Sequence, residues 1–171
     1  MCVMYQHYLA TLQQAEDFLS KLTPSQYTAA AADGGSSIGK HMRHILDHFF
    51  AIANSDGLVD YEQRQRGTAL EADPALALAG LAQLKTWLKQ LPQQHLAQSV
   101  MVRSDIGIGK QQLVHVESTL GRELMFACSH AIHHYAMLKQ LYQQQSEQCL
   151  NAEFGLAPST ATFLRQQQCA L

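Results

Sequence analysis

Four stretches of the chain repeat an apolar residue every three or four positions, and this spacing limits the fold more than any other feature. The spacing runs through residues 4–22, 37–54, 74–91 and 120–145. An α-helix turns once in about 3.6 residues, so each stretch predicts a helix with a single apolar face. Such helices are stable when they bury these faces against one another. The chain therefore predicts an all-α fold, a four-helix bundle.

The residues that flank these stretches mark the ends of the predicted helices. Asp73 before Pro74 combines a capping side chain with a proline at the first helical position. Ser118 or Thr119 can cap the last long helix, and Pro92 stops the third. Thr23 and the proline after it predict one short extra turn. These signals support four separate helices.

The segments between the helices differ in character. Residues 55–73 are polar and without a clear period, so we expect a long connecting loop with room for one helical turn. Residues 100–116 change to short β-branched stretches separated by two glycines, which predicts a small β-hairpin between helices three and four. The tail predicts a turn at Gly155 and a short C-terminal helix after Pro158.

Length and composition restrict the class of protein. A chain of 171 residues with 47% hydrophobic and 15% charged side chains is expected to form a single domain over residues 1–171. Its net charge of −2 and scattered basic residues argue against a nucleic-acid partner. No apolar run approaches the roughly 20 residues that span a bilayer. Four cysteines without a CxxC pair predict reduced thiols and a cytoplasmic location.

Histidines are the main chemical signal. The chain has nine histidines, a high number compared with its twelve lysines and arginines. His130 and His134 are four residues apart, so they project about 40° apart from one helix face. That face also carries Leu124, Ala131 and Leu138, which directs the pair into the bundle. Because buried imidazoles are costly without a partner, a metal site is one explanation.

A third ligand would have to come from another helix. Residues 37–54 offer His41, His44 and His48 on the rim of the apolar face, and spacing alone does not choose among them. The sequence lacks HExxH, which argues against a zinc peptidase, and lacks Glu-x-x-His, which argues against a carboxylate-bridged di-iron bundle. Hydrogen-bonded core histidines are the alternative to any metal.

Two segments resemble a known family. "SSIGKHMRHILDHF" and "RELMFACSHAIHHYAML" are similar to the signature helices of the DinB/YfiT superfamily of bacterial four-helix bundles, and "VDYEQRQRG" and "FGLAPST" extend the resemblance from Ser36 to Thr160. Members usually hold a metal with one histidine of the second helix and an HxxxH pair of the last long helix. The resemblance therefore implies a metal site formed by His44, His130 and His134.

The same resemblance implies an activity. Related members are metal-dependent transferases or isomerases that use low-molecular-weight thiols. It leads us to expect a divalent metal, zinc or nickel, that activates such a thiol, or water, against a small electrophilic substrate, as a thiol S-transferase or a hydrolase. Two alternatives stay open: a non-enzymatic, stress-associated bundle with a structural metal, and a bundle that has lost its metal and whose histidines only pack.

Other residues receive weaker predictions. His48 and Glu123 are candidates to orient a ligand, although His48 also suits a partly exposed polar position and Glu123 the first turn of a helix. Tyr61, Arg64 and Arg66 are candidate substrate contacts, although the surface of a polar loop accounts for them at least as well. We expect a small-molecule substrate.

Residues on the other side of the last long helix predict no chemistry. Cys128 faces away from the predicted triad and is not expected to be a nucleophile, and the neighbouring His133 is expected to pack between helices. Met125, Ile132 and Ala136 form a second apolar surface on that helix. Together with the tendency of relatives to dimerise, this surface predicts a homodimer.

Overall fold

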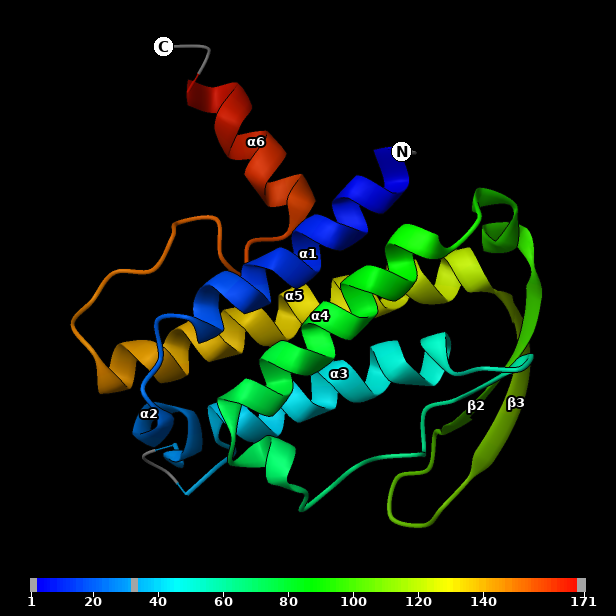
Figure 1. The fold of residues 1–171 in the computed structure, drawn as a ribbon, viewed down its shortest axis with the longest axis horizontal. Coiled ribbons are helices and arrows are strands. Elements are labelled where there is room, and N and C mark those ends of the chain that lie inside the picture. The colour runs from blue at the N-terminus through cyan, green and yellow to red at the C-terminus, as the bar shows by residue number, and fades with distance from the viewer. Residues whose placement is uncertain (1–2, 32–33, 169–171) are drawn as a thin grey trace.

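Four long helices pack side by side in the computed structural model, which describes residues 3–31 and 34–168 (Figure 1). They are α1 (Val3–Leu19), α3 (Ile38–Ala53), α4 (Pro74–Gln90) and α5 (Leu120–Gln145). Helix α3 contacts both α4 and α5, and α1 contacts the same two helices from the other side. The predicted four-helix bundle is confirmed, although α1 ends three residues before the predicted Leu22.

The apolar faces predicted from the sequence form the core. Its fully buried members come from all four long helices: Leu12, Ile45, Leu46, Phe49, Leu81, Leu84, Leu124 and Leu138. Burying a side chain of this size contributes about 1.5–3 kcal/mol relative to leaving it exposed. The bundle therefore rests mainly on these faces.

Side-chain caps fix the helix starts. Ser37 accepts a hydrogen bond from the amide of Lys40 at 3.2 Å, and Asp73 accepts one from the amide of Ala75 at 2.9 Å. Thr119, one of the two residues proposed from the sequence, caps α5. The predicted turn after Thr23 is the short helix α2 (Pro24–Thr28), which begins with a capping box.

A three-stranded sheet closes one end of the bundle (Figure 1). The predicted hairpin is present as β2 (Ser99–Asp105) and β3 (Leu113–Thr119), which pair antiparallel. The predicted loop over residues 55–73 contains an unpredicted strand, β1 (Leu58–Asp60), which pairs parallel with β2. A three-residue strand is too short to show a period of two, so its partner strand decides its conformation.

The rest of that loop lies against α3. It includes the short 3₁₀ helix η1 (Ala69–Glu71), and a second one, η2 (Gln93–Ala97), follows α4. The hydroxyl of Tyr27 donates to the carbonyl of Leu70 at 2.8 Å. Gly39 permits this approach, because a Cβ at that position would lie 2.0 Å from the carbonyl oxygen of Glu71. The first turn of α3 is therefore covered by the loop.

The chain ends in α6 (Pro158–Gln168), which projects away from the bundle (Figure 1). This helix confirms the short C-terminal helix expected after Pro158. Within the described part of the chain, none of the helices combines the length and the hydropathy required to cross a membrane.

Candidate metal centre

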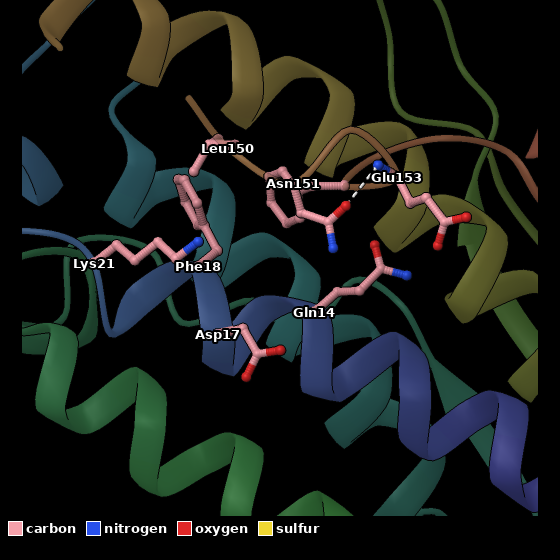
Figure 2. Close-up of a pocket in the computed structure, with 8 residues that line it drawn as sticks. Gln14, Asp17, Phe18, Lys21, Leu150, Asn151 and Glu153 are labelled. Atoms are coloured by element: carbon pink, nitrogen blue, oxygen red, sulfur yellow. Dashed lines mark hydrogen bonds between the residues drawn. The ribbon is translucent and has the colours of Figure 1, made fainter. Parts of the chain in front are cut away.

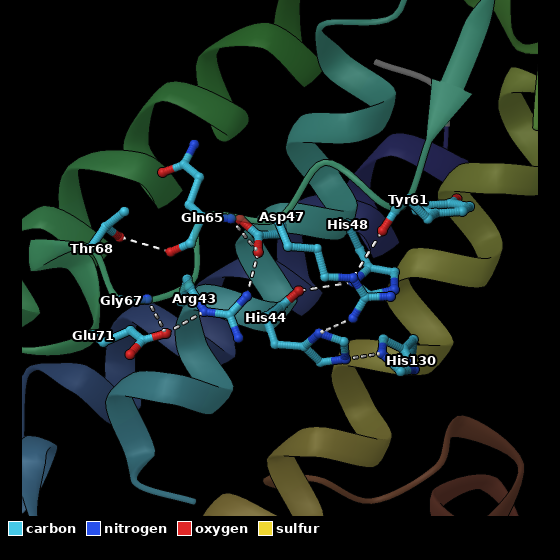
Figure 3. A network of polar contacts seen from close by, with 11 residues as sticks. Arg43, His44, Asp47, His48, Tyr61, Gln65, Gly67, Thr68, Glu71 and His130 are labelled. Carbon is cyan, nitrogen blue, oxygen red and sulfur yellow. Dashed lines mark hydrogen bonds and ion pairs between the residues drawn. The ribbon is translucent and has the colours of Figure 1, made fainter. Parts of the chain in front are cut away.

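Three imidazoles converge between α3 and α5. Nε2 of His130 lies 2.9 Å from Nε2 of His44 and 3.2 Å from Nε2 of His134. One ligand atom from each of the three residues falls within 4.8 Å of the others. Figure 3 shows His44 and His130 facing one another across the two helices. The HxxxH pair of α5 therefore meets a single histidine of α3.

The spacing of these atoms fits a divalent metal. Zinc binds imidazole nitrogens at about 2.0–2.1 Å, so tetrahedral ligands stand roughly 3.3 Å apart. The nitrogen separations of 2.9 and 3.2 Å reach this value with small side-chain rotations. An all-imidazole donor set suits zinc or nickel better than magnesium or calcium, which prefer oxygen. The three histidines are positioned to bind a metal ion.

The surroundings keep these imidazoles neutral. Burial, with added repulsion from neighbouring histidines, lowers the pKa of His44 to about 2, of His134 to about 3 and of His130 to about 4. Metal ions bind the neutral ring, through a nitrogen that carries no proton. At neutral pH the site is therefore ready to bind metal without first releasing protons from imidazolium groups.

The ring nitrogens that face away from the cluster distinguish the roles of the α3 histidines. If Nε2 of each ligand faces the metal, its Nδ1 carries the hydrogen. Nδ1 of His134 lies 3.0 Å from Nδ1 of His41, which can accept that hydrogen. His41 is thus placed to orient His134 from behind. The sequence offered it only as an alternative ligand, because its position on the rim does not reveal which ring atom it would meet.

His48 lies beside two of the three ligand histidines. Its Nδ1 donates to the backbone carbonyl of His44 at 2.9 Å. Its ring centroid stands 4.5 Å from that of His44 and 4.4 Å from that of His130. These contacts suit the predicted orienting role, which stays a prediction.

Glu123 lies in the first turn of α5, the position predicted from the sequence as the alternative to orienting a ligand. Its buried carboxylate accepts hydrogen bonds from Tyr61 at 2.6 Å and from Ser118 at 2.5 Å, and it pairs with Arg122 at 2.9 Å. These groups, and not a ligand imidazole, take its oxygens. Glu123 precedes His130 by seven positions, about 10 Å along the helix axis, so its carboxylate lies at the end of α5 nearest the sheet.

Tyr61 connects this carboxylate to the histidines. It follows β1 directly and is buried, so it is not the surface loop residue that the loop composition favoured. Its ring stacks on His48 with centroids 5.1 Å apart. With its hydroxyl committed to Glu123, the side chain supports the site through its ring face.

Arg64 approaches the triad directly, whereas Arg66 is exposed. Arg64 is half-buried, and its Nη1 lies 3.1 Å from Nδ1 of His44. Its Nε donates to the carbonyl of Tyr61 at 2.9 Å. Of the three loop residues proposed as substrate contacts, Arg64 is the one placed at the rim of the histidine cluster.

An ion-pair network holds the loop beside this cluster (Figure 3). Arg43 pairs with Asp47 at 2.5 Å and with Glu71 at 2.7 Å, and Asp47 also accepts from the amide of Gln65. The spacing of Arg43 and Asp47, four residues apart on one helix, was the available sequence signal. Its extension to Glu71 depends on the path of the loop and could not be predicted.

The far side of α5 carries a different surface. Cys128 is buried there and packs with Thr11 of α1, and burial raises the pKa of its thiol to about 12. Met125, Ile132 and Ala136 line a groove of about 490 Å³ beside it. A raised pKa keeps this thiol protonated at neutral pH, and the expectation that Cys128 is not a nucleophile stays a prediction. The homodimer stays a prediction, to be tested by light scattering.

A smaller pocket of about 100 Å³ lies between α1 and the segment that precedes α6 (Figure 2). Phe18 stacks on Phe154 there with ring centroids 4.8 Å apart. Asn151 accepts a hydrogen bond from the amide of Glu153 at 3.0 Å. None of the nine histidines lines it. It marks the place where the C-terminal segment packs onto the bundle.

Acid should destabilise the metal-free protein through its clustered histidines. Burial lowers the pKa of five clustered histidines: His41, His44, His48, His130 and His134. Between about pH 6.5 and the lowered native values the unfolded chain binds more protons, so stability falls as pH falls. We expect a lower urea midpoint at pH 5.0 than at pH 7.5, with chelator present. Equal midpoints would contradict the burial of these rings as neutral groups.

The fold and the histidine cluster define a helical-bundle protein with a candidate three-histidine metal centre. The model of the DinB family matches residues 1–147. The chain belongs to the DinB family, as the resemblance of its two histidine-bearing segments implied.

One solved structure and one relative by sequence are similar to this chain. A crystal structure of a DinB-like protein of Bacillus subtilis, YjoA, superposes with a TM-score of 0.65 at 20% identity, covering 91% of this chain and all of that one. FK506-binding protein 5 of Rhizopus delemar is 26% identical over 110 residues, which are 64% of this chain and 28% of that protein. The chain thus spans less than a third of that relative.

Proposed function

We propose that the protein is a metal-dependent enzyme in which His44, His130 and His134 hold a zinc or nickel ion. The ion would activate a low-molecular-weight thiol, or water, against a small electrophile. The observation that carries this proposal is the convergence of three Nε2 atoms between α3 and α5. Three protein ligands leave a coordination position for a substrate, which is the arrangement of catalytic zinc sites.

The neighbouring histidines support an open position. Among the residues that the structure describes, the group able to hold a metal has three members and gains no fourth. Nδ1 of His41 is turned to the outer nitrogen of His134, and Nδ1 of His48 is bonded to the His44 carbonyl. Neither side chain is arranged to close the coordination sphere. The vacant position would therefore be available to a thiol or water.

The residues of the chain have distinct parts in this proposal. A bound divalent metal lowers the pKa of a coordinated thiol or water, so that a nucleophile exists at neutral pH. His41 would fix the ring of His134. The ring of His48, itself held by the His44 carbonyl, would support the rings of His44 and His130 by packing against them. The ring of Phe126 stacks on His130 with centroids 5.7 Å apart, and Tyr61 packs against Phe126. Together these two rings cover the cluster with apolar surface. Their cover limits access of water to the ligands.

The experiment is a turnover screen with matched variants. Protein loaded with one equivalent of zinc or nickel is mixed with a panel of low-molecular-weight thiols and 1-chloro-2,4-dinitrobenzene, and separately with aryl esters. We expect metal-dependent product formation that falls to background in His44→Ala. Metal-loaded protein without turnover on any pair would overturn the enzymatic proposal. We place such an activity in cytosolic detoxification or the stress response, where thiols are kept reduced.

One observation favours a non-enzymatic role as the second candidate. The cluster joins α3 to α5, so a metal there would cross-link the two helices at the centre of the bundle. A ligand that binds only the native state stabilises it in proportion to the logarithm of its concentration. A large increase in Tm on metal addition, with no turnover in the same screen, would support a structural metal.

A further inference from the structure

We propose that Arg64 and the Nδ1–H of His44 form a receptor for one carboxylate group of the substrate. This inference rests on the proposed function, because it concerns the state in which His44 binds a metal. It names the class of molecule that the site accepts: a thiol, or its electrophilic partner, that carries a carboxylate a few bonds from the reacting atom.

The position of Arg64 is fixed by its own loop. Its Nε donates to the carbonyl of Tyr61 at 2.9 Å. Tyr61 is itself anchored, because its hydroxyl donates to the buried Glu123 and its ring stacks on His48. The guanidinium therefore stays near the cluster, with Nη1 turned to His44.

The contact between Arg64 and His44 determines where the histidine proton lies. A guanidinium only donates, so at 3.1 Å from Nη1 the Nδ1 atom of His44 must accept. The hydrogen of the neutral ring is then on Nε2, from which it can be donated to His130 at 2.9 Å. This tautomer cannot bind a metal through Nε2.

Metal binding reverses that arrangement. When Nε2 of His44 binds a metal, the ring hydrogen moves to Nδ1, and two donors, Nδ1–H and Nη1–H, then face each other. The corresponding nitrogen of His134 has no such conflict, because His41 can accept from it. The mismatch therefore arises at His44 and not at His134. An anionic oxygen placed between the two groups satisfies both donors.

The neighbouring acidic residues limit the negative charge that a ligand of Arg64 can carry. The cleft on the outer side of Arg64, about 400 Å³, is lined by Asp47, Asp56 and Asp60. Their negative charge disfavours a phosphate dianion more than a carboxylate. Asp47 and Asp60 are already paired with Arg43 and Arg103, so neither is free to replace His44 as the partner of Arg64.

Two thiols of equal length test the receptor. Cobalt-loaded protein is titrated with 4-mercaptobutyrate and with 4-mercapto-1-butanol, and thiolate binding is followed by its near-ultraviolet charge-transfer band. We expect the carboxylate thiol to bind about tenfold more tightly or better, a factor that corresponds to roughly 1.4 kcal/mol. Arg64→Met should remove the preference. Arg66→Met, an exposed arginine of the same loop, should keep it.

Each outcome separates the receptor from the proposed function. Equal binding of the two thiols by the wild-type protein overturns the receptor and leaves thiol activation standing. A preference that survives in Arg64→Met shows chelation of the metal by the carboxylate, and also overturns it. If neither thiol binds, thiol activation itself fails.

A second measurement does not use a thiol. Arg64→Met removes both a cation and a hydrogen bond that compete with the metal at His44, so its zinc affinity should rise several-fold in a competition titration. The affinity of Arg66→Met should match that of the wild-type protein. An unchanged or weaker affinity in folded Arg64→Met would overturn the proton arrangement on which the receptor depends.

Discussion

Replacing His130 and His134 together with alanine should lower the affinity for zinc by at least about a thousandfold. The free energy of binding at zinc sites in zinc-finger peptides is about 10–16 kcal/mol and is shared among the ligands, so the loss of two of three removes most of it. The remaining His44 has His48 and Arg64 beside it, and neither is placed to replace the lost nitrogens. The measurement is a competition titration against a chromophoric chelator.

The matched control lies on the same helix. His133 was expected to pack between helices, but it is exposed on α5 and lies beside His134 without entering the cluster. His133→Ala should keep the wild-type affinity within about twofold, because it removes no ligand. A double variant that still binds one zinc as tightly as the wild-type protein would place the metal elsewhere.

The second large effect concerns Gly39, in the first turn of α3. A methyl group there would stand 2.0 Å from the carbonyl oxygen of Glu71 and 2.7 Å from Cε1 of Tyr27. To avoid this clash the η1 backbone must move, and η1 also contains Glu71, which forms an ion pair with Arg43. Overpacking costs about 1–3 kcal/mol and occasionally more, and a backbone obstacle belongs to the upper end. We expect Gly39→Ala to lower the free energy of unfolding by about 3 kcal/mol in urea titrations.

Gly80 provides the opposite control. It also lies within a buried part of a helix, but an added Cβ would meet Leu46 at 3.4 Å, an ordinary contact. Alanine in a helix interior is favoured over glycine by about 0.5–1 kcal/mol, so Gly80→Ala should be neutral or stabilising. A Gly39→Ala variant as stable as the wild-type protein would refute the close approach of η1 to α3.

The parts of the fold that follow from local periodicity were predictable. Each long helix buries one apolar face, so apolar residues recur in the sequence with a period of about 3.6 residues. Strand β1 was not predictable, because Leu58 and Asp60 take their conformation from pairing with Met101 and Arg103, some 43 residues away. Contacts of this kind depend on the three-dimensional path of the chain and leave no local pattern.

The candidate site was likewise predictable only in part. The HxxxH spacing predicted that His130 and His134 share a face, and the structure has them converge. The family resemblance, and not the spacing, selected His44 over His41 and His48. The structure shows that His44 alone brings its Nε2 into the cluster, whereas His41 meets the outer nitrogen of His134.

The loop residues were the least predictable. Arg64 and Tyr61 reach the histidines because residues 61–71 are held on α3 by Arg43, Asp47 and Glu71. A polar segment without periodicity does not indicate which of its side chains will be buried. The sequence therefore favoured an exposed Tyr61. This prediction was wrong, because the Tyr61 ring is buried against His48.

The proposed site is a metal held by three histidines with a position left for a thiol. X-ray absorption on protein purified without chelator or nickel affinity resin tests it most directly. We predict about one zinc or nickel per chain, three imidazole nitrogens in its shell, and a new sulfur neighbour at about 2.3 Å when a thiol is added. A protein without metal, or a shell of four imidazoles that a thiol leaves unchanged, would contradict the account.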